Sequence, residues 1–279
     1  MSLIVRVLNK LNLIKYLNFN IKTKVNNSIF KIPILGGIGL SNQVISEPWM
    51  ITILENLLKK KNGAYLDIGV NIGQTLMKLK SVNPKIEYIG FEPNATCVHY
   101  VNKLIDINKI ENVSIYPVGV SNENNFYELS LYSNDDSDSG ASMIDNFRDK
   151  NTISKKRFIG CYNLNEPNIK LPTISIIKID VEGAELEVLK GLENTILRDN
   201  PIIQIEILPV YDEGNFMRLS RQNEIEKILK DWGYGILRIH YTASNEFVKL
   251  QRIDNIGIHA DLKMCEYIFV SLDEIDSLL

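Results

Sequence analysis

The sequence predicts an α/β fold with a mostly parallel sheet covered by helices on both faces, and three observations support this. Apolar segments of strand length alternate with segments of helical period from about residue 48 onward, which is typical of parallel sheets. The 279 residues are 45% hydrophobic and 23% charged, a globular composition that excludes general disorder. The longest apolar stretches fall short of the roughly 18 to 20 residues that a membrane-spanning helix needs.

Seven segments are predicted as strands because they are apolar and bounded by turn residues. They are residues 64–68, 88–92, 113–118, 174–180, 202–207, 235–240 and 267–271. Helical periods predict helices at 48–60, 73–81, 96–108, 184–198 and 222–232. We therefore expect one domain over residues 47–279.

A long insertion at about residues 122–171 interrupts this alternation. It begins with the strand-like alternation of residues 126–132 and continues with an acidic, serine-rich run at 133–142. That run has too little apolar content to be ordered by core burial alone. We expect a partly mobile lid over the acceptor side of a cleft, and a solvated surface loop without function is the alternative.

Residues 1–46 are predicted to form a separate basic arm. No Asp or Glu occurs before Glu47, whereas the arm carries Arg6, Lys10, Lys15, Lys22, Lys24 and Lys31. Apolar residues at helical spacing over residues 2–17 predict a basic amphipathic helix, and residues 26–46 are read as a short strand and loop. The helix could pack on its own domain, on a partner or on a membrane surface.

The segment over residues 64–75 is the most informative one. An apolar strand runs into a turn with Gly69 and Gly73, and glycine lets backbone approach a ligand closely. The spacing is GxNxG, because a dinucleotide GxGxxG counted from Gly69 fails at Asn71 and Gln74. The turn therefore suits an uncharged ribose and an amino-acid tail better than a pyrophosphate.

A carboxylate at the end of the second predicted strand completes a nucleoside site. Glu92 follows Gly73 by 19 residues and lies in the phrase Gly90-Phe-Glu-Pro-Asn. At a strand end, a carboxylate can accept hydrogen bonds from both hydroxyls of a ribose. The two features in this order predict a site for a nucleoside.

Four motifs in these segments resemble the FkbM-type S-adenosylmethionine-dependent methyltransferases. They are Leu66-Asp-Ile-Gly-Val-Asn-Ile-Gly-Gln, Ile89-Gly-Phe-Glu-Pro-Asn, Val118-Gly-Val-Ser-Asn and Ile177-Lys-Ile-Asp-Val-Glu-Gly-Ala-Glu-Leu-Glu-Val-Leu-Lys-Gly. The resemblance implies a Rossmann-like class I methyltransferase fold with a seven-stranded sheet and a reversed last strand. It also implies methyl transfer to a hydroxyl, often of a sugar or secondary metabolite.

The resemblance also assigns cofactor residues by position. Those implied around the methionine portion of the cofactor are Asp67, Gly69, Asn71 and Gly73. Glu92 is implied as the ribose ligand, and the adenine edge is implied at the turns that contain Pro93, Asn94, Val118 and Gly119. This chain departs from the usual pattern at Val70 and Val120, and neither change should abolish binding.

Carboxylates at two neighbouring strand ends are the candidates for catalysis. Asp180 ends an otherwise apolar strand at the carboxyl edge of the sheet, and Glu206 ends the next one. One could act as general base, or the two could share a Mg²⁺ that binds the acceptor oxygen. His259 is a minor alternative base. Glu182 and Glu185 precede or open a helix, where the helix dipole favours carboxylates without any catalytic role.

We expect an O-methyltransferase that acts on a sugar, glycan or secondary metabolite. The alternatives are an NAD-dependent nucleotide-sugar oxidoreductase and a non-catalytic ligand-binding protein. The net charge of −3 gives no reason to expect a nucleic-acid partner. Without a signal-peptide pattern or paired cysteines among Cys97, Cys161 and Cys265, we expect a cytoplasmic protein, peripheral to a membrane if the arm binds one.

Overall fold

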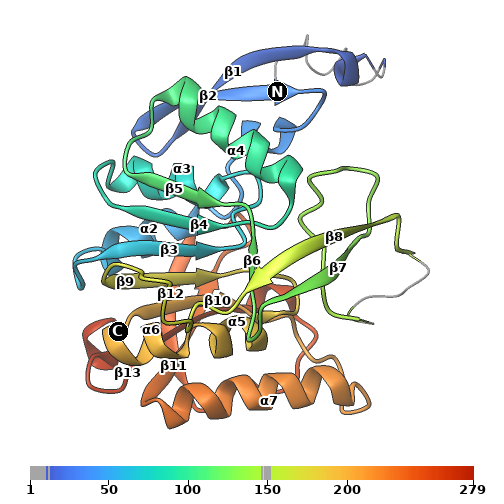
Figure 1. The fold of residues 1–279 in the computed structure, drawn as a ribbon. Coiled ribbons are helices and arrows are strands. Elements are labelled where there is room, and N and C mark those ends of the chain that lie inside the picture. Colours follow the sequence, from blue (N-terminus) through green and yellow to red (C-terminus); the bar gives the residue numbers. More distant parts are fainter. Residues whose placement is uncertain (1–10, 12, 146, 148–151) are drawn as a thin grey trace.

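The computed structural model describes residues 11, 13–145, 147 and 152–279. Its centre is an eight-stranded sheet (Figure 1). From one edge to the other the strands are β12 (Phe247–Ile253), β11 (Tyr234–Tyr241), β13 (Glu266–Ser271), β10 (Ile202–Glu206), β9 (Ile174–Ile179), β3 (Ala64–Ile68), β4 (Tyr88–Phe91) and β5 (Val113–Tyr116).

The strand directions confirm the predicted mostly parallel sheet with a reversed last strand. β10, β9, β3, β4 and β5 pair in parallel, whereas β13 is antiparallel to both β10 and β11. The chain builds outward from β3 to β5 and then returns to place β9 on the other side of β3. The strand order therefore reverses between β3 and β9, the switch point where such sheets bind ligands.

The eighth strand, β12, was not predicted. It pairs with β11 at the sheet edge, and its residues are exposed or half-buried along its whole length. A strand without a buried face lacks the alternation of apolar and polar residues from which strands are recognised. The seven predicted strands all exist, with ends that differ by at most two residues.

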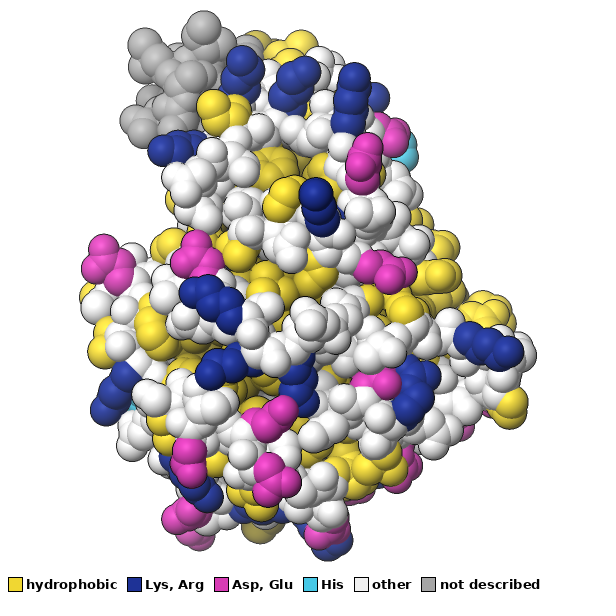
Figure 2. Space-filling model, turned by 90° about the vertical axis from the view of Figure 1, so that its left-hand side faces the viewer, with side chains coloured by type: hydrophobic (Ala, Val, Ile, Leu, Met, Phe, Trp, Pro, Cys, Tyr) yellow, Lys and Arg dark blue, Asp and Glu magenta, His cyan; other side chains and the backbone are white. Residues whose placement is uncertain are grey.

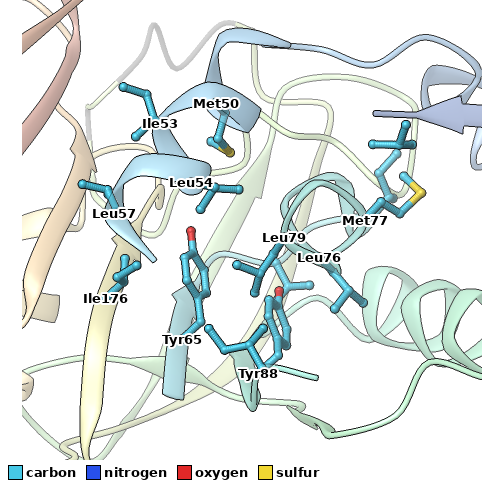
Figure 3. Close-up of a cluster of buried hydrophobic side chains, with 14 of the residues drawn as sticks. Met50, Ile53, Leu54, Leu57, Tyr65, Leu76, Met77, Leu79, Tyr88 and Ile176 are labelled. Carbon is cyan, nitrogen blue, oxygen red and sulfur yellow. The ribbon is translucent and has the colours of Figure 1, made fainter. Parts of the chain in front are cut away.

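Alternate residues of each central strand point into two separate cores. One face is covered by α2 (Trp49–Leu57), α3 (Gln74–Val82) and α4 (Ala95–Asn108). Figure 3 shows Tyr65 and Tyr88 of neighbouring strands beneath α2 and α3, with their rings stacked 6.1 Å apart. Leu66 and Ile89, the next residues along the same strands, point into the other core.

The second face is covered by α5 (Glu185–Gly191), α6 (Glu193–Asp199) and α7 (Phe216–Asp231). The prediction of one continuous helix at 184–198 is wrong, because the segment forms two helices, α5 and α6. Leu192 leaves the helical conformation, and a Cβ on Gly191 would lie 2.2 Å from the carbonyl oxygen of Ser121. The absence of a Cβ at Gly191 thus lets the chain after β6 (Gly119–Val120) approach α5 closely. α7 starts at Phe216, six residues before its predicted start, and Asn215 is its N-cap.

The arm contains a two-stranded hairpin, of which the sequence predicted only one strand, within residues 26–46. β1 (Asn18–Val25) pairs with β2 (Ser28–Leu35), and β2 lies on α4. Val25, Phe30 and Ile32 belong to the same buried cluster as α2, α3 and α4. The helix predicted over residues 2–17 lies mostly outside the described residues, and its described end forms the 3₁₀ turn η1 (Ile14–Tyr16). The domain boundary at residue 46 stays a prediction.

The insertion builds a small sheet of its own. β7 (Asn125–Leu131) pairs antiparallel with β8 (Lys155–Tyr162), which pairs in parallel with β6. Figure 1 shows this sheet on the side toward which the strands β3, β4 and β9 point. The three cysteines are free and buried. Within the described part of the chain, no helix has the length and apolar character needed to cross a bilayer.

Candidate active site

A cavity of about 630 Å³ lies at the carboxyl ends of β3, β4, β9 and β10. The predicted cofactor residues that line it are Gly69, Asn71, Glu92, Pro93, Asn94 and Gly119. The predicted catalytic carboxylates Asp180 and Glu206 line it as well. Asp67, Gly73, Val118 and His259 do not line it. The structure therefore brings most of the predicted residues together at the switch point of the sheet.

The turn after β3 has its shape because two of its positions require left-handed backbone. Gly69 has φ +95°, and a Cβ there would lie 1.9 Å from the carbonyl oxygen of Asp180. Only glycine allows the turns after β3 and β9 to pack this closely. Asn71 has φ 47°, which asparagine tolerates better than most residues. The turn then leads directly into α3, with Gly73 at its N-cap.

Glu92 is held at the end of β4 by the backbone of two turns. Its Oε2 accepts a 2.8 Å hydrogen bond from the Asn71 N–H, and its Oε1 accepts a 2.8 Å bond from the Asn94 N–H. Burial raises the pKa of Glu92 to about 7, although these two bonds oppose the rise. Each carboxylate oxygen can accept about two hydrogen bonds. Both oxygens therefore keep acceptor capacity toward the cavity.

Asn94 connects the end of β4 to two further elements. Its Oδ1 accepts from the Thr96 N–H and so caps α4, and its Nδ2 donates to the Asp136 carbonyl at 2.7 Å. Gly119 lies against Cys161, since a Cβ on Gly119 would be 2.5 Å from that sulfur. Pro93, Asn94 and Gly119 thus form a narrow wall between α4 and the small sheet of the insertion.

Asp67 lies below the cavity and not in its wall. The side chain is fully buried, accepts a hydrogen bond from the Tyr88 hydroxyl, and leaves Oδ1 without a partner. Burial raises its pKa to about 6. Its strand neighbour Lys178 opposes this rise. In this structure Asp67 supports the floor of the cavity.

Asp180 and Glu206 form a hydrogen-bonded carboxyl pair that faces Lys178. The Lys178 ammonium lies 2.8 Å from Asp180 Oδ2. Burial alone would raise the pKa of Asp180, but Lys178 and the bond from Glu206 together hold it below its ordinary value. Burial and the charges of Asp180 and Glu266 raise the pKa of Glu206 to about 11. Asp180 is therefore the ionised partner, and its side chain is 36% exposed to the cavity.

Further buried charges lie beneath this pair. Glu266 is opposite Glu206 in the β10–β13 register, and the buried Lys78 ammonium lies 3.0 Å from Glu47. Burial opposes the charge on Lys178, yet Asp180, Asp67 and Glu47 raise its pKa well above its ordinary value. Lys178 thus offsets the carboxylates around the floor of the cavity, whereas burial lowers the pKa of Lys78 despite its pairing with Glu47.

A magnesium site at Asp180 and Glu206 finds no support in this geometry. Among the described residues, no group of three or more His, Cys, Asp or Glu side chains is placed to hold a metal ion. Lys178 already neutralises Asp180, and Glu206 carries a proton at neutral pH. A hard cation prefers several ionised oxygen ligands.

His259 is not near the two carboxylates. Its Nε2 lies 3.2 Å from the Tyr267 hydroxyl, and its backbone N–H donates to the Val210 carbonyl. Tyr267 packs in the core under α7, on the face of the sheet opposite to its strand neighbours Glu266 and Ile268. Alternation along β13 points Tyr267 into that core, and His259, which contacts Tyr267, does not line the cavity.

Two glutamates that follow Asp180 have different surroundings. Glu182 lines the cavity and adopts φ 52° in the tight turn after β9. Glu185 is buried, and its Oε1 accepts a 2.8 Å hydrogen bond from the Gly183 N–H at the start of α5. Burial raises the pKa of Glu185 to about 7. Its contacts are those of a residue that stabilises the turn.

The acidic run of the insertion lies over the turns after β3 and β4. Asn71 Nδ2 donates to the Ser137 carbonyl at 3.3 Å, as Asn94 does to Asp136. The run is ordered locally by its own aspartates, because Asp138 Oδ2 accepts from the N–H groups of residues 132 and 133 and Oδ1 from that of Gly140. Several of its residues line the cavity, namely Ser133, Asp135, Ser137, Asp138 and Ser139.

The cavity wall also contains polar and charged residues that were not predicted, among them Ser41, Ser46, Glu47, Lys78 and Lys178. A lysine within the apolar strand Ile176-Ile-Lys-Ile was a usable signal for Lys178, because lysine is rarely buried without a charged partner. The others carried no signal. Ser41 and Ser46 reach the cavity only because the chain after the β1–β2 hairpin turns toward α3, where the Ser46 N–H donates to Gln74 Oε1.

The strand order, the reversed β13 and a cavity at the switch point define this protein as a class I methyltransferase in its fold. The model of the methyltransferase FkbM domain matches residues 67–236, which is more than half of the chain. The chain belongs to the FkbM methyltransferase family.

Individual relatives are distant. The chain is 22% identical over 205 residues to methyltransferase sdnD of Sordaria araneosa, covering 63% of this chain and 75% of that protein. It is 26% identical over 163 residues to methyltransferase 1 of Beauveria bassiana (strain ARSEF 2860), covering 50% of this chain and 63% of that protein. An FkbM methyltransferase structure from Methylobacillus flagellatus KT matches with a TM-score of 0.45 and 17% identity, over 75% of this chain and 43% of that one.

Proposed function

We propose that this protein is an S-adenosylmethionine-dependent O-methyltransferase that methylates a hydroxyl of a sugar, glycan or secondary metabolite. The observation that carries the proposal is Glu92, a carboxylate fixed by two backbone N–H groups at the cavity wall, with acceptor capacity left on both oxygens. That arrangement suits the two hydroxyls of a ribose. Family membership supplies the methyl-transfer chemistry.

The residues present fit the cofactor. Glu92 would hold the ribose, the turn at Gly69 and Asn71 would lie along the methionine portion, and Pro93, Asn94 and Gly119 would border the adenine. S-adenosylmethionine supplies an electrophilic methyl group, so the protein mainly has to orient the reactants and remove a proton. Asp67 would support the turn from below.

Asp180 is the proposed general base. It is ionised beside Lys178, partly exposed to the cavity, and close to Gly69 at the switch point. An ionised carboxylate within hydrogen-bond reach of an acceptor hydroxyl can take up its proton as the methyl group is transferred. The protonated Glu206 would orient Asp180 through their shared hydrogen bond.

The acceptor side of the proposed site is formed by the insertion. Hydroxyl and carboxylate side chains of residues 133–139 line the cavity there. Such a wall can hydrogen-bond a polyhydroxylated acceptor, which favours a sugar over an apolar compound. This wall supports the proposed substrate class.

A thermal-shift panel tests the cofactor directly. We expect S-adenosylmethionine and S-adenosylhomocysteine to raise the melting temperature, because a ligand that binds only the folded state stabilises it. NAD and NADP should leave it unchanged. A shift with NAD alone would replace this proposal by the oxidoreductase. Radiolabelled S-adenosylmethionine with a panel of sugars and glycosides then identifies the acceptor.

A further inference from the structure

The outward face of the β1–β2 hairpin is strongly basic. Along β1 the exposed residues include Lys22 and Lys24, and along β2 they include Ile29 and Lys31. The register places Lys22 opposite Lys31 and Lys24 opposite Ile29, so all four share one face. We call this set the hairpin face.

The local sequence does not neutralise the hairpin face. Like charges directly opposite one another destabilise a pair of strands, yet Lys22 and Lys31 occupy such positions. No acidic residue precedes Glu47, and every acidic residue belongs to the rest of the chain. Figure 2 shows basic side chains spaced along the upper end of the molecule, where Figure 1 places the hairpin.

Exposed apolar side chains accompany these lysines. Ile29 is 69% exposed at the end of the hairpin face nearest the turn, and Tyr16 is 75% exposed just before β1. The Lys15 ammonium lies 5.1 Å from the centre of the Tyr16 ring. Lysine stems with exposed aliphatic and tyrosine side chains are typical of surfaces that rest at a membrane–water interface.

We propose that the hairpin face docks this protein on an anionic lipid bilayer. The lysines supply electrostatic attraction to acidic headgroups, and Ile29 and Tyr16 supply shallow insertion. The net acidic remainder of the chain is repelled by the same surface and orients the protein with the hairpin toward it. Ser41 and Ser46, which follow the hairpin, line the cavity, so docking brings the cavity wall near the lipid surface.

A nucleic acid is the less favoured anionic partner. Exposed Ile29 and Tyr16 side chains gain nothing from phosphate contacts, whereas they gain from a headgroup layer. On the face that Figure 2 shows, the surface below the hairpin is mixed in charge and carries no continuous basic track. The proposal concerns location and does not depend on the methyl acceptor.

Co-sedimentation of the full chain with vesicles tests the proposal. We expect binding to phosphatidylcholine vesicles that contain phosphatidylserine, little binding to pure phosphatidylcholine, and loss of binding at high salt. The double variant Lys22→Gln/Lys31→Gln should bind about 25-fold more weakly, at about fivefold per lysine. Ile29→Ser should also weaken binding without changing the charge.

The matched control is Lys249→Gln/Lys263→Gln, which removes two exposed lysines far along the chain from the hairpin. It should bind vesicles as the unmodified chain does. Equal loss in both double variants would show a general charge effect and overturn the proposal. Binding of the chain to an oligonucleotide but not to phosphatidylserine vesicles would overturn it as well. Melting temperatures of each variant show that the fold is retained.

Discussion

The carboxylate of Glu92 accepts a 2.8 Å hydrogen bond from the backbone N–H of Asn71, 21 residues earlier in the chain. This bond ties the end of β4 to the turn after β3, and the bond from the Asn94 N–H ties it to the start of α4. The orientation of Glu92 is therefore fixed before any ligand binds. Preorganised acceptors of this kind lose little entropy on binding.

Glu92→Ala should weaken S-adenosylmethionine binding by about 10- to 100-fold, because hydrogen bonds to a charged acceptor contribute roughly 1.5–3 kcal/mol. Isothermal titration calorimetry measures the effect. Glu87→Ala is the matched control, since Glu87 is exposed near the opposite end of the same strand. Unchanged affinity in Glu92→Ala would refute the ribose assignment.

The affinity for S-adenosylmethionine should depend on pH near 7. Ribose hydroxyls favour the ionised carboxylate, and the pKa of Glu92 is raised to about 7. Below that pH the carboxyl is increasingly protonated, so affinity should fall by at most about tenfold per pH unit and level off above it. Titrations over a pH series check this, and Glu92→Gln should remove the dependence on this group.

The same shift has a consequence for stability with a definite sign. Burial raises the pKa of Glu92 from 4.5 to about 7 in the folded chain, so the folded state binds more protons than the unfolded state between these values. Its contribution to the free energy of unfolding therefore falls as pH rises through this window. Denaturant unfolding measures the free energy of unfolding at each pH. Between pH 4.5 and about 7 this free energy should change with pH by a different amount in the unmodified chain than in Glu92→Gln. Parallel pH profiles would contradict the shift.

Asp180→Asn should lower turnover by about 10²- to 10⁴-fold, the usual contribution of a general base, while cofactor affinity persists. Glu206→Gln is the matched variant. Because Glu206 is protonated at neutral pH, the amide keeps a neutral donor toward Asp180, and we expect only a severalfold loss. Full turnover of Asp180→Asn with the true acceptor would show that Asp180 is not the general base.

EDTA should leave turnover unchanged. Lys178 neutralises Asp180, and the proton on Glu206 removes the second ionised ligand that Mg²⁺ would need. Assays with EDTA, followed by added Mg²⁺, measure this. Loss of activity with EDTA and its recovery with Mg²⁺ would show that the two carboxylates hold a metal after all.

The acidic run of the insertion should gain protection from hydrogen exchange when cofactor and acceptor bind together. Asn71 and Asn94 already hold the carbonyls of Ser137 and Asp136, so a ligand between them adds contacts to the loop. Exchange of residues 133–142 with and without both ligands measures the change. Asp138→Ala should raise exchange there, because it frees three N–H groups. If hydrogen exchange of residues 133–142 does not change when both ligands bind, this run is a surface loop without a role in binding.

Much of the fold follows from local sequence. Short, largely apolar segments such as β3, β4, β9 and β10 are typical of strands buried on both faces, and the helices between them favour parallel pairing. The prediction of strands and helices failed where a segment buries only one face or no face. β12 has no buried face, and the start of α7 is exposed at Phe216.

The sequence by itself determined the position of the turn at Gly69, the strand-end Glu92 and the strand-end Asp180, because each depends on residue type at the end of one strand. Only the tertiary structure decided which side chains surround these residues and which charge states they have. The register of β9 and β10 places Glu206 beside Asp180, and His259 lies 3.2 Å from the Tyr267 hydroxyl, which belongs to the core on the α7 face of the sheet. Charge states depend on burial and on neighbours distant in sequence, so the folded chain alone sets them.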